Sequence, residues 1–192
     1  LFVAAVALMV VSPALRAQAL GVGKLLVASR EVGDPNFSRT VVLLVRYGRT
    51  GVVGLILNRP SQTPLSVALK GMEEARGRSD PIYLGGPVGL GGALALLRTQ
   101  EPPPEAPRVL DGVHLLSSRE ELARGLASRA GPASLRVYLG YAGWTHPRLQ
   151  AEVSRRIWHV LDGSSGIVFD AYPASLWERL IPKAEPKLAR LQ

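Results

Sequence analysis

The stretch TVVLLVRYGRTGVVGLILN, from Thr40 to Asn58, decides how this chain of 192 residues folds. Its two halves, 40–47 and 52–58, are rich in β-branched residues, which favour strands. Between them lies GRTG (48–51), and a four-residue connection bracketed by glycines is typical of a β-hairpin. Neither half alternates strictly between apolar and polar residues. The sequence therefore predicts a hairpin that is covered on both faces, inside the core rather than at a wet edge.

Further short strands are expected on both sides of this hairpin. They are the apolar, β-compatible segments 24–29, 82–84, 93–99, 113–116, 135–140 and 166–169. The glycine-rich segment 85–92 separates two of them. It has no Lys-Ser/Thr after the glycines and no G-x-G-x-x-G that opens a helix, so neither nucleotide-binding fingerprint applies. Glycine is expected here to permit turns with positive φ and a close approach of strands.

Helices are expected between these strands, at 64–72, 118–128, 147–161 and 174–181. Ser118 and Glu121 form a capping box, in which each residue satisfies a free amide at the helix start. The most regular pattern is that of 147–161, where four apolar residues recur at helical spacing opposite charged ones. These four residues are Leu149, Val153, Ile157 and Val160.

Clustered strands with interspersed helices, and no regular βαβ alternation, indicate an α+β fold. The length suits one domain with a sizeable core. We expect this single compact domain to span 20–182, followed by a C-terminal tail at 183–192. The proline-rich segment 101–107 (EPPPEAP) favours polyproline II and predicts an exposed loop within the domain, not a boundary.

The first nineteen residues differ from the rest and resemble a secretory leader. Leu1–Val11 is wholly apolar and is followed by Pro13 and the small-x-small triplet Ala17-Gln18-Ala19, which are features of a signal and its cleavage site. No charged n-region precedes the apolar run. The run is shorter than the ~20 residues that cross a bilayer as a helix. The leader (1–19) predicts export to the periplasm and a mature chain without an integral membrane span. The alternatives are a buried N-terminal helix and a cytoplasmic protein.

Composition excludes several kinds of chemistry. With no cysteine there is no disulfide framework, thiolate metal site or cysteine nucleophile, and three histidines leave little scope for a multi-histidine centre. We therefore expect no metal and no cofactor. The formal net charge of +8 comes from basic residues scattered along the chain, without blocks and without interleaved aromatics. We expect weak, salt-sensitive and sequence-independent binding to polyanions.

Three polar residues at the ends of predicted strands are candidate site residues: Asp34, Asn58 and Arg59. Loops on a rigid scaffold commonly carry binding residues. Each residue also has a structural interpretation: Asp34-Pro35 initiates a turn, Asn58 satisfies local backbone groups, and Arg59-Pro60 is an extended exit from the strand. Both interpretations stay open at this point.

The most distinctive local feature is Tyr141-Ala142-Gly143-Trp144, at a predicted junction of strand and helix. Its aromatic rings can line an apolar pocket with a polar handle, or Trp144 can fill the core beneath the helix. Gly143 is expected to let the backbone turn sharply. Glu152, in the helix that follows, is expected to pair with Arg148, Arg155 or Arg156. Tyr141, Trp144 and Glu152 complete the candidate ligand or partner site.

Four stretches of the chain together resemble the YqgE/AlgH family of bacterial proteins. They are Gly23–Ala28 with Asp34–Phe37 and Thr40–Leu44, then Gly54–Pro60, then Gly85-Gly86-Pro87-Val88, and finally Gly140–Trp144 with Leu149, Glu152, Trp158 and Leu176-Trp177. The resemblance implies one α+β domain with a mixed, partly barrel-like sheet surrounded by helices. It implies structural roles for Gly85, Gly86, Pro87, Gly140 and Gly143. It carries no catalytic residue, and the family is largely uncharacterised, although one branch is labelled a transcriptional regulator.

These observations favour a non-enzymatic binding or regulatory module with a protein or small-molecule partner that the sequence does not identify. One alternative is a small-molecule binder or hydrolase with a site near Asp34, Asn58, Arg59 and Trp144. A serine nucleophile lacks support, because Ser117 and Ser118 have no G-x-S-x-G context. The second alternative is a nucleic-acid-binding transcriptional regulator.

Overall fold

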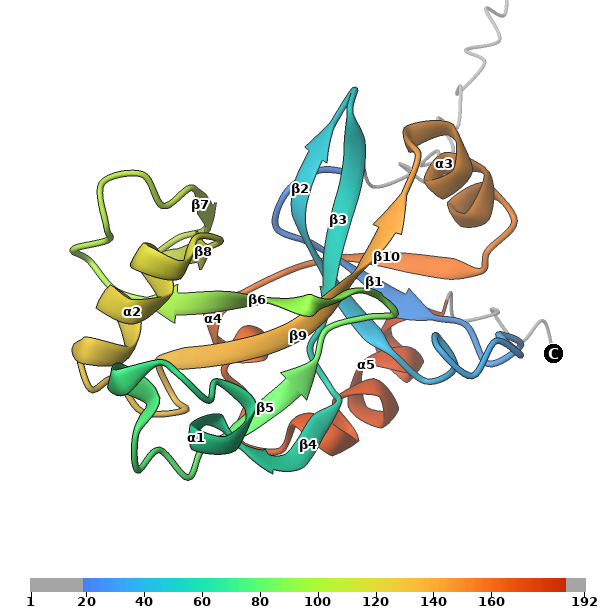
Figure 1. Cartoon of the computed structure of the whole chain (residues 1–192). Coiled ribbons are helices and arrows are strands. Elements are labelled where there is room, and N and C mark those ends of the chain that lie inside the picture. The colour runs from blue at the N-terminus through green and yellow to red at the C-terminus, as the bar shows by residue number, and fades with distance from the viewer. Residues whose placement is uncertain (1–18, 186–192) are drawn as a thin grey trace, which may run out of the picture.

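Residues 19–185, the part of the chain that the computed structural model describes, form ten strands and five α-helices (Figure 1). The strands are β1 (Lys24–Ala28), β2 (Val41–Gly48), β3 (Gly51–Ile56), β4 (Pro60–Pro64), β5 (Pro81–Leu84), β6 (Val88–Arg98), β7 (Arg108–Leu110), β8 (Val113–Leu116), β9 (Leu135–Trp144) and β10 (Trp158–Asp162). The helices are α1 (Leu65–Ala68), α2 (Arg119–Ala127), α3 (His146–Ser154), α4 (Ser165–Val168) and α5 (Leu176–Ala184), with short 3₁₀ turns at Glu73–Ala75 and Pro173–Ser175. The predicted leader lies outside the described residues except for Ala19, and so does most of the predicted tail.

The strands join one mixed sheet in the order β10-β1-β2-β3-β9-β6-β8-β7. Most neighbours are antiparallel, while β5 pairs with β9 in parallel and brings β4 with it. The sheet is strongly curled in Figure 1, where β2 and β3 rise across the long β6–β9 pair. Helices α4 and α5 lie beside one part of the sheet, and α1 and α2 beside another. This arrangement confirms the predicted α+β domain with a partly barrel-like sheet.

The predicted hairpin forms β2 and β3, paired from Val42↔Ile56 to Gly48↔Gly51 with a register shift between Leu44 and Arg46. The first five residues of β2 are almost fully buried. Both faces are therefore covered at the base of the hairpin, as its lack of alternation predicts, whereas its far end from Arg46 to Gly51 is partly or fully exposed. Two apolar clusters flank the sheet: the larger contains β1, β2 and α5, and the smaller contains α1, α2 and the far ends of β6 and β9.

Glycines allow the backbone of the β5–β6 connection to lie directly against the backbone of β9. A Cβ atom on Gly85 would lie 2.4 Å from the carbonyl oxygen of Gly140, and one on Gly140 would lie 2.5 Å from that of Gly86. Gly86 and Gly140 also have φ angles of 153° and 66°, a region that favours glycine. The close strand approach and the positive φ angles expected for 85–92 are confirmed. Part of that segment belongs to β6, whose register against β9 shifts between Val88 and Ala93.

Three predictions about local structure are wrong. The predicted helix 147–161 ends at Ser154, and its second half turns back at Arg156 (φ 60°) to form β10. The predicted strand 166–169 lies in helix α4, which Ser164 caps by accepting a hydrogen bond from the Ile167 amide. No sharp turn occurs at Gly143, because β9 continues to Trp144 and pairs there with β3.

Two other local findings bear on the predictions. The capping box at the start of α2 is confirmed, with Ser118 accepting from the Glu121 amide and Glu121 accepting from the Ser118 amide. Burial raises the pKa of the Glu121 carboxyl, but its hydrogen bonds from Ser117 and Ser118 outweigh burial and lower the pKa overall. Within residues 19–185, every helix is too short or too polar to span a bilayer.

Candidate functional site

A pocket of about 370 Å³ lies between the loop after β1 and the turn that joins α3 to β10. The loop, residues 29–37, forms one wall, and the last turn of α3 with residues 155–157 forms the other. This volume falls within the range of pockets that hold small molecules. The pairing of β1 with β10 brings the two walls together, because Ser29 follows β1 and donates a backbone hydrogen bond to Ile157, which precedes β10.

An aromatic cluster lies beneath this pocket. The ring of Phe37 lies 5.8 Å from that of Trp144 and 5.7 Å from that of Trp158, measured between centroids, and the two indoles meet edge to face at 6.0 Å. Trp158 and the half-buried Phe37 line the pocket, together with the apolar side chains of Val32 and Ile157. The pocket therefore has an apolar floor.

Glu152 connects the aromatic cluster to α3. Its Oε2 atom accepts hydrogen bonds from the indole Nε1 of Trp144 at 2.9 Å and of Trp158 at 2.8 Å. Its Oε1 atom accepts from Nε of Arg148 at 2.8 Å, one helical turn away. The expected pairing with Arg148 is thus confirmed. Since both oxygens have partners within the protein, Glu152 fixes the floor of the pocket.

The rim of the pocket carries opposite charges on its two walls. Arg155 and Arg156 lie on the α3 side, and Glu31 and Asp34 lie on the loop side. Among the described residues, no carboxylate lies within ion-pair distance of Arg155 or Arg156. These two guanidinium groups are exposed and can contact a ligand without breaking an ion pair of the described fold.

Arg59 holds the loop wall in place from behind, and Asn58 binds the segment that leads from the loop into β2. Asn58 accepts a hydrogen bond from the Val41 amide and donates to the carbonyl oxygen of Arg39, both at 2.9 Å. Arg59 donates to the carbonyl oxygens of Asn36, Pro35 and Ser38. Burial lowers the pKa of the Arg59 guanidinium, and the charge of Asp34 acts in the opposite direction. Both side chains bind backbone groups, but these groups belong to segment 35–41 and not to the local backbone that the structural interpretation of Asn58 expects.

The structure divides the predicted site residues among four places. Asp34 and Glu152 line the pocket, Trp144 lies under its floor with 6% of its surface exposed, and Asn58 and Arg59 support the loop and the segment that leads from it into β2. Tyr141 lines a different cavity, of about 230 Å³, which shares no residue with the first. Lining residues that are absent from the candidate list include Phe37, Arg155, Arg156 and Trp158. Only the pairing of β1 with β10, which sequence reasoning missed, brings these residues to the same pocket.

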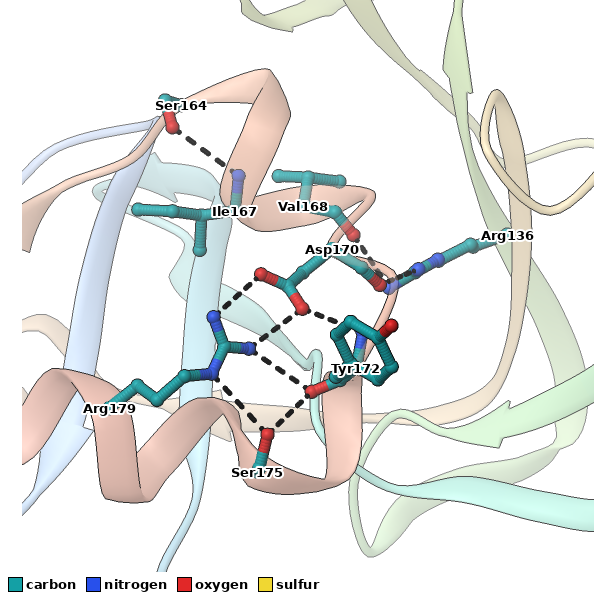
Figure 2. Close-up of polar contacts among 8 residues, drawn as sticks. All are labelled: Arg136, Ser164, Ile167, Val168, Asp170, Tyr172, Ser175 and Arg179. Carbon is teal, nitrogen blue, oxygen red and sulfur yellow. Dashed lines mark hydrogen bonds and ion pairs between the residues drawn. The ribbon is translucent and has the colours of Figure 1, made fainter.

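A second polar network lies at the corner before α5 and serves the fold (Figure 2). The buried Arg136 donates to the carbonyl oxygens of Val168, at 2.9 Å, and Asp170. The Asp170 carboxylate accepts two hydrogen bonds from Arg179, at 2.7 and 2.9 Å, and one from the Tyr172 amide. Figure 2 shows these groups pointing toward one another. We therefore assign this network to the attachment of α5.

A family model described as AlgH-like matches residues 25–189. The chain belongs to the AlgH-like family. Curated relatives include a UPF0301 protein of Streptomyces avermitilis, 34% identical over 175 residues with 87% of this chain and 88% of the relative covered. Another is a UPF0301 protein of Chlorobaculum tepidum, 34% identical over 160 residues with 83% and 84% covered. These findings confirm the resemblance to the YqgE/AlgH family.

Solved structures support the same conclusion about this AlgH-like chain. The solution structure of the AlgH protein from Pseudomonas aeruginosa matches with a TM-score of 0.68 and 27% identity, covering 84% of this chain and 87% of that one. A crystal structure of a protein from Corynebacterium diphtheriae matches with a TM-score of 0.75 over 91% and 92% of the two chains; at 16% identity it shows the fold alone. None of these four names states an activity.

Proposed function

We propose that this protein is a non-enzymatic binding module whose site is the pocket between loop 29–37 and the end of α3. The observation that carries the proposal is the combination of a preformed apolar floor with two arginines, Arg155 and Arg156, that have no carboxylate partner among the described residues. Pockets that bind small molecules typically pair an apolar lining with a few placed polar groups. We infer that the pocket takes an organic acid with an apolar body.

The opposite wall restricts this ligand further. Glu31 and Asp34 would repel a polyanion, so a nucleic acid or a highly phosphorylated molecule suits the pocket poorly. The same two carboxylates can accept hydrogen bonds from amide or ammonium groups. A ligand with one carboxylate, hydrogen-bond donors and an aromatic or aliphatic group complements all parts of the pocket.

The residues of the pocket favour binding over catalysis. In the described lining, Ser29 is the only hydroxyl group, and neither histidine nor lysine accompanies it as a base. Both oxygens of Glu152 have partners within the protein. The described residues also contain no group of three potential metal ligands.

The proposal is tested by titrating the protein with N-acetyl-L-phenylalanine, which has one carboxylate, one amide and one aromatic ring. We expect saturable binding, and we expect its uncharged amide derivative to bind at least about tenfold more weakly, because it cannot form charge-assisted hydrogen bonds with arginine. The variant Arg155→Ala/Arg156→Ala should show the same loss for the acid. Arg49→Ala, at the exposed tip of the β2–β3 hairpin, is the matched control. Equal binding of the acid and its amide, or equal binding by both variants, would contradict the proposal.

A further inference from the structure

A second cavity, of about 230 Å³ and here called the sheet cavity, lies between the β2–β3 hairpin and the part of the sheet formed by β6, β8 and β9. All five strands contribute to its lining, and it shares no lining residue with the pocket between loop 29–37 and α3. In Figure 1, β2 and β3 rise across the long β6–β9 pair, and β8 lies farther along β6. Small ligands are commonly bound in the mouth of a barrel-like sheet.

The lining of the sheet cavity is mainly apolar. Its apolar side chains are those of Val45, Val53, Ala93, Leu94, Leu115 and Tyr141. Two of these residues, Val45 and Leu115, are buried, and the other four are half-buried. A ligand with an apolar body can therefore reach apolar surface here and remove it from water, which favours binding.

A β-bulge in β2 brings Arg46 to this apolar cavity. The pairing with β3 passes from Leu44 to Arg46 while β3 advances by a single residue, so Val45 is an extra residue of β2. Neighbouring residues of a regular strand point to opposite faces of the sheet, but Val45 and Arg46 both line the cavity. Bulges re-aim side chains and are over-represented next to active sites. The irregularity of β2 thus places a guanidinium group beside apolar surface.

The charges around the sheet cavity are one-sided. Among the described residues, no carboxylate lies within ion-pair distance of the exposed Arg46. The described lining contains neither aspartate nor glutamate, and its other polar side chains are the hydroxyls of Ser117 and Tyr141. The buried Glu121 lies outside the lining and accepts hydrogen bonds from the backbone amides of Ser117 and Ser118. The cavity therefore suits an anion, in contrast to the first pocket, which has an acidic wall.

We propose that the sheet cavity is a second binding site and that it takes a short-chain fatty acid. The carboxylate accepts charge-assisted hydrogen bonds from Arg46, and the alkyl chain covers the half-buried side chains of Val53 and Leu94. The volume lies below the roughly 300–1,000 Å³ of sites for drug-sized ligands, so the chain is short. The proposal is independent of the function proposed for the first pocket.

The first test is a ¹³C–¹H titration of the protein with butanoate, pentanoate and hexanoate, read from the methyl groups of Val53, Leu94 and Leu115. We expect saturable shifts of these signals. Each added methylene should tighten binding about fourfold, because more alkyl surface is buried. Uncharged hexanamide should bind at least about tenfold more weakly than hexanoate, since its interaction with arginine is not charge-assisted. Absence of saturable shifts, equal affinity along the series, or equal binding of hexanoate and hexanamide would overturn the proposal.

The second test compares two variants of the same hairpin. Arg46→Ala should weaken hexanoate binding at these methyl groups at least about tenfold, whereas Arg49→Ala, at the exposed tip, should leave it unchanged. Because Arg46 is exposed, the fold should tolerate its truncation, and thermal unfolding checks this. Equal binding by the two variants would contradict the role of Arg46 and with it the proposal.

The two proposed sites can be separated in the same spectra. Hexanoate is itself an acid with an apolar body, and the indole signal of Trp158 reports its entry into the first pocket. Arg155→Ala/Arg156→Ala should leave the methyl shifts of Leu94 and Leu115 unchanged. If hexanoate shifts Trp158 alone, the sheet cavity is not a binding site, while the function proposed for the first pocket stands. If the methyl groups respond but N-acetyl-L-phenylalanine does not bind, the proposed function fails and the sheet cavity stands.

Discussion

The indole of Trp144 and the carboxylate of Glu152 are joined by a hydrogen bond of 2.9 Å, and Trp158 donates to the same oxygen atom at 2.8 Å. One acceptor thus satisfies two largely buried donors that come from β9 and β10. These two hydrogen bonds connect β9 and β10 to α3. It makes the floor of the pocket a fixed part of the fold.

Replacing Glu152 with alanine should destabilise the protein, because both indole N–H groups lose their acceptor. A buried donor left without a partner costs about 1–3 kcal/mol. Glu152→Gln keeps one acceptor oxygen and should lose less. Urea unfolding of the three proteins measures the effect, with Glu120→Ala on the exposed side of α2 as the control. If Glu152→Ala unfolds at the same urea concentration as the control, Glu152 does not support the floor.

Trp144→Ala should lower the free energy of unfolding by about 3–5 kcal/mol, the range for truncating a core aromatic. The physical reason is burial: Trp144 is 6% exposed and packs against Phe37 and Trp158. Tyr172→Ala, at a position that is 75% exposed, is the matched aromatic control and should be close to neutral. Thermal unfolding of both variants decides the matter. If the melting temperature of Trp144→Ala equals that of wild type, Trp144 is not a core residue, and its assignment to the ligand site is favoured instead.

Gly86→Ala should be strongly destabilising, whereas Gly91→Ala should not. A Cβ atom on Gly86 would lie 2.2 Å from the backbone carbon of Tyr141, while one on Gly91 would meet nothing within 4 Å. Overpacking alone costs about 1–3 kcal/mol, and the φ of 153° at Gly86 adds strain. Denaturant melts of the two variants compare them directly. Equal stability would show that β9 and the β5–β6 connection are not in backbone contact.

Acid should weaken the attachment of α5. The hydrogen bonds from Arg179 hold the pKa of the Asp170 carboxyl below its ordinary value, so the stability from this pair is present above pH ~3.9 and is lost as the pH falls through the lower folded pKa. Asp170→Asn should cost about 1 kcal/mol at pH 7, since Arg179 is half exposed. The difference in the free energy of unfolding between Asp170→Asn and wild type should shrink toward pH 2. A constant difference in the free energy of unfolding between Asp170→Asn and wild type from pH 7 to pH 2 would contradict the assignment.

The sequence predicts the elements that local rules determine. The hairpin around GRTG forms because both of its strands consist mainly of β-branched and apolar residues. The capping box forms because each side chain, of Ser118 and of Glu121, accepts a hydrogen bond from the other residue's backbone amide, only three residues away. By contrast, the spacing of Leu149, Val153, Ile157 and Val160 fits a helix throughout. Pairing with β1 overrides that pattern after Ser154. Such pairing is non-local, so periodicity within 147–161 does not reveal it.

The same error explains why the pocket is only partly predicted. Asp34 and Glu152 are on the candidate list, but Trp158 and Arg156 reach them only when the chain leaves the helix and enters β10. A helix continuing to Leu161 would not pair with β1 beside the loop that carries Asp34. The glycine pattern at 85–92 likewise predicts close strand approach, yet it does not specify that the approaching segment is Gly140-Tyr141 of β9.

The indole N–H signals of the three tryptophans give the most direct test that the pocket is a binding site. Trp158 lines the pocket and Trp144 shares its acceptor, whereas Trp177 donates to the Ala28 carbonyl oxygen and is not part of the lining. In a ¹⁵N–¹H titration with N-acetyl-L-phenylalanine, the Trp158 signal should shift most and saturably, Trp144 less, and Trp177 least. Unchanged Trp158 and Trp144 signals at the highest ligand concentration, or a uniform shift of all three, would contradict binding at this pocket.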